Sequence, residues 1–217
     1  MSFGSYVSFT VVTFSGIFAV VDPFTALPAF LAMTPTNTPA ERAAMARRAS
    51  IAALLILAGF ALAGGLLFKF FGVTLASFKM AGGLLLLLMA IDMLRAQPSR
   101  TRQSPEEAAE GAAKSDVAIF PLATPLLAGP GSIATTMVFM GRSTSWWQTL
   151  PVLLSIVLTC LIAYLLLRSA SVIDRLMGRT GMNVLNRIMG LILAAIAVQF
   201  MVDGLRASFP HLLGPEA

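Results

Sequence analysis

Two proline-broken segments contain the residues of this chain that could bind a small ligand. The first reads Asp22-Pro23-Phe24-Thr25-Ala26-Leu27-Pro28, and the second extends from Ala123 to Thr136. A carboxylate beside a helix break can bind a cation, and the free amides where a helix restarts can bind an anion. The candidate substrate-binding residues are Asp22, Pro23, Thr25, Pro28, Pro125, Gly129, Pro130, Gly131, Ser132 and Thr135.

Asp22 has two interpretations. Pro23 removes a backbone donor and disfavours helical geometry in the residue before it, so we expect a helix to end near Asp22 and restart at Pro23. Asp22 would then be the N-cap, with proline at the first helical position. Alternatively, its carboxylate faces a central cavity and binds a substrate amine, a proton or a cation. A charge at mid-membrane depth costs about 2.5–3.5 kcal/mol on insertion scales, which favours a functional role.

The second segment combines prolines, glycines and hydroxyl side chains in an apolar stretch without charge. A helix that restarts near Gly131 or Ser132 would direct free amides and the positive end of its dipole toward a carboxylate. The alternative is a proline-kinked span whose small residues permit close helix packing. Together the two breaks could hold a zwitterion, and the small residues around them leave room for a small ligand.

The composition places both segments in a membrane. The chain of 217 residues is 57% hydrophobic and 12% charged, with a mean hydropathy of +0.84, whereas soluble domains are about 25% charged. A membrane helix needs about 20 mostly apolar residues. The sequence therefore predicts an all-α polytopic membrane protein with six transmembrane helices, at about residues 5–33, 50–71, 73–94, 117–140, 149–167 and 184–205.

A polar linker at residues 95–116 separates a first half (1–94) from a second half (117–217), each with three spans. The linker has almost no bulky apolar side chain, which predicts a mobile cytoplasmic loop. Three spans per half give the second half the opposite orientation. Pro23 and Pro130 are 107 residues apart, and Lys79 and Arg187, each followed by glycine three residues later, are 108 apart. This spacing predicts a 3+3 inverted repeat with broken helices 1 and 4.

The basic residues predict the orientation in the membrane. With the N-terminus outside, eleven of the fifteen Lys and Arg residues face the cytoplasm, and the outer side holds Lys69, Lys79, Arg142 and Arg206. We therefore expect a multi-pass protein of the bacterial inner (plasma) membrane with both termini outside, in the periplasm. No Lys or Arg precedes the first span, which indicates an uncleaved span rather than a signal peptide.

Residue counts argue against other functional classes. Cys160 and His211 are the only cysteine and histidine, so a disulfide and a His/Cys metal cluster are excluded by number. The sequence contains no nucleotide-binding loop and no recognisable catalytic constellation, so we expect no enzyme and no cofactor. The basic residues form no stripe with aromatic residues, which argues against nucleic-acid binding. A non-transporting membrane scaffold or an intramembrane enzyme is the alternative of another class.

Three motifs occur in order along the chain. They are Asp22-Pro23-x-x-x-x-Pro28, Ala81-Gly82-Gly83-Leu84 with Ala90-Ile91-Asp92-Met93-Leu94, and Pro125-Leu126-Leu127-Ala128-Gly129-Pro130-Gly131-Ser132-Ile133. With them, essentially the whole chain resembles the MarC family. The resemblance implies a bacterial or archaeal inner-membrane protein with six spans, and some members of the family transport small neutral amino acids. The family usually has glycine where this chain has Thr25, so the added bulk and hydroxyl imply that the ligand can differ.

The resemblance and the paired breaks together predict a secondary transporter of small neutral amino acids such as glycine or alanine, coupled to protons. The expected partners are a small-molecule substrate, protons and the lipid bilayer, and the sequence leaves a homo-oligomer open. The first alternative is an exporter of another small solute or a drug on the same fold. A drug pocket should be larger and richer in aromatic residues than these breaks.

Overall fold

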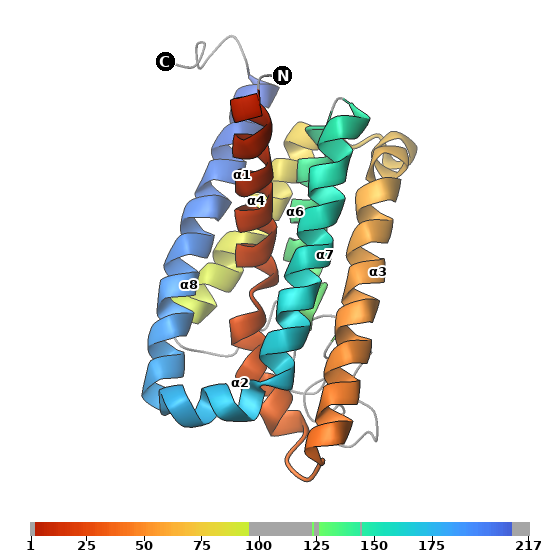
Figure 1. Cartoon of the computed structure of the whole chain (residues 1–217). Coiled ribbons are helices and arrows are strands. Elements are labelled where there is room, and N and C mark those ends of the chain that lie inside the picture. The colour runs from red at the N-terminus through yellow and green to blue at the C-terminus, as the bar shows by residue number, and fades with distance from the viewer. Residues whose placement is uncertain (1–2, 96–122, 124–125, 144, 210–217) are drawn as a thin grey trace.

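The computed structural model describes residues 3–95, 123, 126–143 and 145–209, and these residues form helices and no strand. Figure 1 shows a bundle of long helices in which α1 begins and α8 ends at the same end of the molecule. The all-α prediction is confirmed for the described residues. The elements are α1 (Phe3–Val21), α2 (Pro23–Met33), α3 (Pro39–Phe71), α4 (Leu75–Leu94), α6 (Pro130–Gly141), α7 (Trp146–Arg168) and α8 (Ala170–Ser208).

Five described stretches are long and apolar enough to cross a membrane. They match the first, second, third, fifth and sixth expected spans, which confirms a multi-pass helical membrane protein. The fourth expected span, 117–140, lies partly outside the described residues. Helix α6 covers its last part from Pro130 onward, so the count of six and the inverted repeat are not confirmed. The linker beyond Arg95 also lies outside the described residues. The five stretches are Gly4–Met33, Pro39–Phe71, Leu75–Leu94, Trp146–Arg168 and Thr180–Ser208.

Helix α3 begins at Pro39, although the sequence predicted a span starting near residue 50. Thr38 caps the helix: its hydroxyl accepts from the Glu41 amide at 3.3 Å, and the Glu41 carboxylate accepts from the Thr38 amide at 2.8 Å. This reciprocal capping box starts a polar extension of the helix before its apolar part. Hydropathy detects the apolar part alone, so the predicted span begins inside the helix, near residue 50.

Arg42 joins three segments at the end of the bundle where α3 begins. Its Nε donates to the carbonyl oxygen of Thr34, which caps the end of α2, at 3.0 Å. Its Nη1 donates to Ser171 Oγ, in the first turn of α8, at 2.9 Å. One side chain thereby satisfies a helix-end carbonyl of a buried residue and links the first part of the chain to the last.

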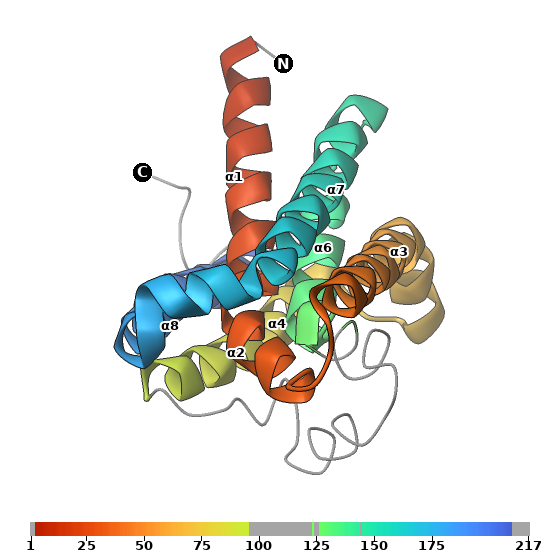
Figure 2. The ribbon, with the colours of Figure 1, turned by 60° about the horizontal axis from the view of Figure 1, so that its bottom comes forward.

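Helix α8 bends at Gly178, which has φ 59° and ψ −179°, a left-handed conformation that favours glycine. Figures 1 and 2 show the segment before the bend lying across the end of the bundle, while Thr180–Ser208 runs along it. Val172 and Leu176 are exposed four residues apart, and charged Asp174 and Arg175 lie between them. This arrangement is typical of a helix at a membrane surface.

The most extensive helix contact joins α4 to α8. A methyl group at Gly83 would lie 2.7 Å from the Ala197 carbonyl oxygen, and one at Gly190 would lie 3.2 Å from the Ala90 carbonyl oxygen. Residue numbers rise along α4 as they fall along α8, so the two helices are antiparallel. Their backbones approach closely because glycine occupies the contact points.

We predict that Gly83→Ala destabilises the protein, because the new methyl group collides with the Ala197 carbonyl oxygen. The expected loss is about 1–3 kcal/mol, measured as the free energy of unfolding of the detergent-solubilised protein. The matched control is Gly59→Ala in α3, where no atom lies within 4 Å of an added methyl group. This control should be neutral or gain up to about 1 kcal/mol. Equal effects of the two substitutions would contradict the close contact.

Candidate functional site

Asp22 separates α1 from α2 and is fully buried. Its amide donates to the Phe18 carbonyl oxygen at 2.9 Å, which ends α1, and its backbone turns to φ 45°, ψ 69°. It is the one non-glycine residue with positive φ among the described residues, and aspartate is one of the residue types that tolerate this conformation. Pro23 follows at the first helical position, so the predicted N-cap at Asp22 is confirmed.

The Asp22 carboxylate is held by Thr25 from the first turn of α2. The Thr25 amide donates to Asp22 Oδ1 at 3.4 Å, and the Thr25 hydroxyl makes a short hydrogen bond to Asp22 Oδ2. The same hydroxyl lies 3.5 Å from the side-chain oxygen of Asn186 in α8. Phe18 and Phe24 pack edge to face across the break, with ring centroids 6.1 Å apart. A buried carboxylate thus connects α1, α2 and α8.

The second break has a different construction. The Ala128 amide donates to the Ala123 carbonyl oxygen at 2.9 Å, five residues back, which is a π-type turn. Gly129 follows in an extended conformation and α6 begins at Pro130, with no hydrogen bond from a capping side chain. The predicted restart of a helix here is confirmed. The amides of Gly131 and Ser132 belong to the first turn, where a helix has no backbone partner for them.

Buried hydroxyl groups follow α6 away from the break. Ser132 is 3% exposed and Thr135 is fully buried. Among the described residues, the hydroxyl oxygen of Thr135 has no hydrogen-bond partner, and the same is true of the fully buried Thr13 in α1 and Thr159 in α7. Buried polar groups are normally paired with protein or water. Each of these three hydroxyls, on α1, α6 and α7, is therefore a candidate for a hydrogen bond to water or to a ligand.

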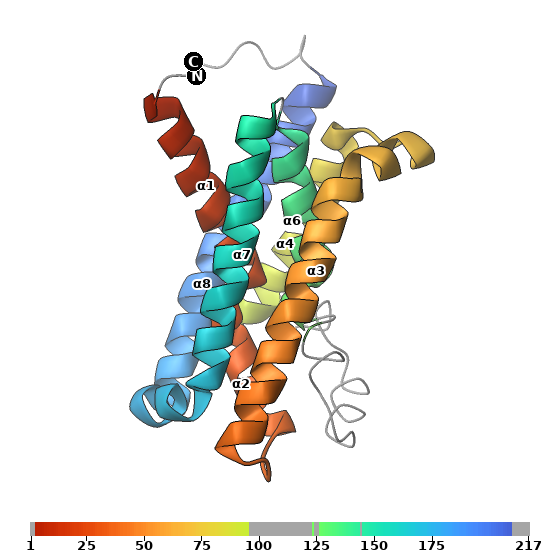
Figure 3. The same cartoon turned by 45° about the vertical axis from the view of Figure 1, so that its right-hand side comes forward.

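The two breaks lie at similar depth in the bundle. A methyl group at Gly16 would lie 2.7 Å from the Phe139 ring, so these residues of α1 and α6 are level with each other. Asp22 is six residues beyond Gly16, about 9 Å along the axis, and Pro130 is nine residues before Phe139, about 13 Å. Because α1 and α6 run in opposite directions (Figure 3), the breaks differ in depth by about one helical turn.

Not all of the predicted site residues face the interior. Pro28 is exposed on α2, and Pro130 is exposed beside an apolar groove between α3, α4 and α6. A methyl group at Gly131 would lie 2.8 Å from Leu86 Cδ2, so Gly131 packs against α4. Pro125 lies outside the described residues. The predicted residues that are buried are Asp22, Pro23, Gly129, Gly131, Ser132 and Thr135, and Thr25 is half-buried.

An apolar groove lies apart from the polar site. The groove beside Pro130 measures about 430 Å³ and is lined by apolar side chains such as Phe60, Phe68 and Met137. It offers no partner for a charged ligand, so it does not serve the chemistry expected at the breaks. In the described part of the chain, no three His, Cys, Asp or Glu residues are grouped so that they could hold a metal ion.

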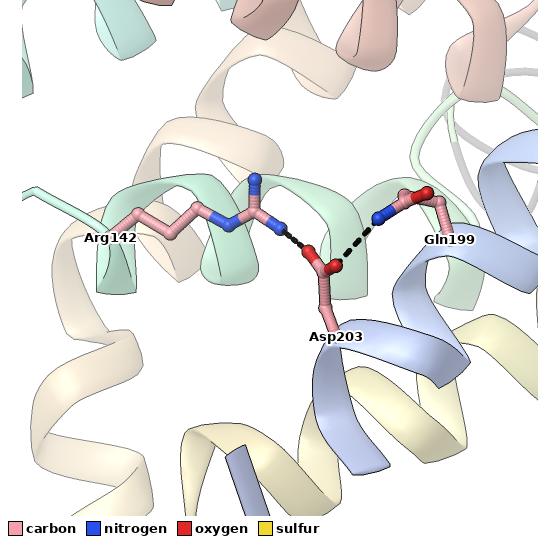
Figure 4. A network of polar contacts seen from close by, with 3 residues as sticks. All are labelled: Arg142, Gln199 and Asp203. Carbon is pink, nitrogen blue, oxygen red and sulfur yellow. Dashed lines mark hydrogen bonds and ion pairs between the residues drawn. The ribbon is translucent and has the colours of Figure 1, made fainter. Parts of the chain in front are cut away.

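A polar network lies at the end of the bundle where α1 begins. Arg142, which caps α6, forms an ion pair with Asp203 of α8, and the Gln199 side-chain amide donates to Asp203 Oδ1 at 2.7 Å (Figure 4). The Arg142 guanidinium also lies 5.5 Å from the centre of the Phe139 ring. Two donors on different helices therefore fix the Asp203 carboxylate. Arg142 and Asp203 are 61 positions apart, so local sequence spacing does not reveal this pair.

Asn186 was likewise not predicted to be near Asp22. The two residues are joined through Thr25, and 161 positions separate Thr25 from Asn186 in the sequence. Asn186 follows an apolar residue in an amphipathic stretch and carries no local signal of a binding role. An inverted repeat would have suggested α8 as a neighbour of the first break, without identifying the residue.

Long apolar helices around a buried carboxylate at a helix break define a polytopic α-helical integral membrane protein. Comparison with known proteins is in accord with this class. The chain belongs to the MarC family of integral membrane proteins, whose pattern it matches over residues 7–209.

Relatives occur in archaea and bacteria and match almost their full length. The chain is 46% identical over 201 residues to the UPF0056 membrane protein MJ1677 of Methanocaldococcus jannaschii, which covers 91% of this chain and 96% of the relative. It is 36% identical to the UPF0056 membrane protein YvbG of Bacillus subtilis, and the match covers 94% of this chain and 98% of YvbG. It is 35% identical to the UPF0056 membrane protein YhcE of Escherichia coli, and the match covers 92% of this chain and 93% of YhcE. No solved structure matches the chain.

We predict that Thr25→Val destabilises the protein by about 1–3 kcal/mol, because it removes a hydroxyl donor from a buried carboxylate. Thr25→Ser keeps the hydroxyl and should restore most of the loss. The control is Thr10→Val, whose hydroxyl bonds to the Tyr6 carbonyl oxygen of its own helix. Thermal unfolding in detergent measures all three variants. Equal losses for Thr25→Val and Thr10→Val would rule out a special role for the Asp22 contact.

A double-mutant cycle tests the ion pair between Arg142 and Asp203. Arg142→Gln and Asp203→Asn should be coupled by about 1 kcal/mol in the free energy of unfolding, since the side chains are only 30% and 21% exposed. High salt should reduce the coupling. Strictly additive effects would show that the pair contributes nothing to stability.

Proposed function

We propose that the chain is a secondary transporter of small neutral amino acids, such as glycine or alanine, in the bacterial inner (plasma) membrane, coupled to protons. The protein binds and releases its substrate without breaking covalent bonds, so it is no enzyme. The observation that carries the proposal is the fully buried Asp22 carboxylate at a helix break, at about the depth where α6 begins. An ionisable group at such a place in a membrane protein marks a substrate or proton site.

The two breaks have complementary charges for a zwitterion. The Asp22 carboxylate can accept hydrogen bonds from a substrate ammonium group, with Thr25 holding its orientation. The uncapped amides at the start of α6 can donate to a substrate carboxylate, assisted by the helix dipole. The unpaired hydroxyl of Thr135 adds a polar group on the same helix. Proton coupling follows if Asp22 takes up a proton when the substrate leaves.

The transport cycle that we propose uses a 3+3 inverted repeat of six spans with both termini in the periplasm. Its support is the antiparallel contact of α4 with α8 and the common end at which α1 begins and α8 ends (Figure 1). In the proposed repeat these two helices are equivalent third spans. Rocking of one half against the other would expose the two breaks to each side in turn.

Thr25 favours a second candidate, a transporter of another small solute. Its side chain occupies the space between Asp22 and Asn186, and its hydroxyl already engages the carboxylate. This side chain leaves less room beside Asp22 than glycine would. Thr25→Gly should therefore widen the range of accepted substrates if the residue limits the site.

The test is uptake and counterflow of labelled glycine, alanine and serine in proteoliposomes, with and without an imposed pH gradient. We predict saturable counterflow in the parent protein and a KM at least about tenfold higher in Asp22→Asn, because one charged hydrogen bond to the ammonium is lost. Stimulation of uptake by the pH gradient should also disappear in this variant.

The matched control is Asp92→Asn, which removes a carboxylate near the end of α4. It should leave KM and the effect of the pH gradient unchanged. Absence of flux above empty liposomes, from protein that unfolds cooperatively, would reject amino acid transport. Flux in which Asp22→Asn behaves as the parent would reject Asp22 as the binding group and leave transport in place.

A further inference from the structure

A second groove lies between α3 and α7, away from the helix breaks. It measures about 270 Å³ and is lined by Arg47, Ser50, Ile51, Leu54, Val157, Cys160, Leu161 and Tyr164. The two helices lie side by side (Figure 3). Residue numbers rise along the α3 wall from Arg47 to Leu54, and this wall is about 10 Å long at 1.5 Å per residue.

One end of the groove is polar. Arg47 is exposed on α3, and Tyr164 faces it from the last turns of α7, where its hydroxyl accepts a hydrogen bond from Arg168 Nη1 at 3.2 Å. Ser50 is 5% exposed and lines the groove, and its hydroxyl oxygen has no hydrogen-bond partner in the described part of the chain. A buried unpaired hydroxyl next to an arginine is a costly arrangement unless a ligand or water completes it.

The rest of the groove is apolar. Ile51, Leu54, Val157 and Leu161 line it beyond the polar end, toward the middle of the bundle. Arg47 lies about two turns from the start of α3, and Arg168 ends α7. Both basic residues are therefore near the same face of the membrane, and the apolar wall extends from them into the hydrocarbon region. The groove is therefore polar near the membrane surface and apolar toward the interior of the membrane.

We propose that this groove binds an anionic phospholipid. The lipid phosphate contacts the Arg47 guanidinium and accepts the hydrogen bond of Ser50, and one acyl chain lies against the apolar wall. Arginine binds phosphate through paired charge-assisted hydrogen bonds, and basic pockets between transmembrane helices bind anionic lipid head groups. A volume of about 270 Å³ suits a single chain rather than a helix of a partner protein. This site is independent of the proposed transport function.

The experiment titrates the detergent-solubilised full chain with dioleoylphosphatidylglycerol or dioleoylphosphatidylcholine. Native mass spectrometry counts bound lipid, and thermal unfolding gives the stabilisation. We expect phosphatidylglycerol to bind more tightly and to raise the midpoint of unfolding more. Arg47→Gln should weaken phosphatidylglycerol binding about fivefold, the effect of one basic side chain at an anionic surface.

Neighbouring residues provide matched controls. Arg48→Gln removes the same charge one position along α3, outside the groove, and should leave binding unchanged. Leu54→Trp fills the apolar wall and should displace the lipid, whereas Leu55→Trp, at a position 67% exposed, should not. Each variant is compared with its own unfolding midpoint without lipid, which separates lost binding from lost folding.

Three results would overturn the proposal. Phosphatidylcholine could bind as tightly as phosphatidylglycerol, which would leave no role for the anionic head group. Arg47→Gln and Arg48→Gln could weaken binding equally, which would reduce the effect to general surface charge. Inorganic phosphate at equal concentration could raise the midpoint of unfolding as much as the lipid, which would remove the role of the acyl chain.

Discussion

A backbone that crosses a membrane must satisfy its hydrogen bonds within the protein, and this constraint explains the first helix break. Pro23 has no amide hydrogen, so α1 ends and the Asp22 carboxylate accepts the hydrogen bond of the Thr25 amide. The buried carboxylate needs further donors, and the Thr25 hydroxyl supplies one. That hydroxyl also lies beside Asn186, so a local break in one helix depends on the position of α8.

The second break meets the same constraint through the backbone. A π-type turn ends at Ala128, Gly129 is extended, and no side chain caps α6. The two helix starts therefore differ in electrostatics. The positive end of the α2 dipole faces its own carboxylate at Asp22, whereas no side chain of the described residues caps the start of α6. An anionic group is favoured at α6 and a cationic group at Asp22. This difference, rather than cavity size, is the physical basis of the proposed site for a zwitterion.

Local sequence signals predicted the local structure well. The proline at position 23 and the aspartate before it predicted the cap, and apolar length predicted five of the spans. The Thr38–Glu41 capping box was visible in the sequence but lay outside the hydropathy criterion. Asn186 could not be predicted, because its position depends on packing between distant helices. Gly131 was ambiguous, since glycine serves both ligand approach and helix packing, and the structure places it against Leu86.

Two antiparallel helix pairs differ in how their surfaces meet. Along α4 and α8, glycines bring backbone against backbone, and a single methyl group would find no room at Gly83. Along α3 and α7, the two surfaces leave a groove of about 270 Å³ between them. Close-packed contacts resist deformation, whereas a contact with a void can rearrange at lower cost. Asn186, which approaches the first break, belongs to the close-packed pair. The candidate site therefore adjoins, on one side, the most extensive helix contact in the described bundle.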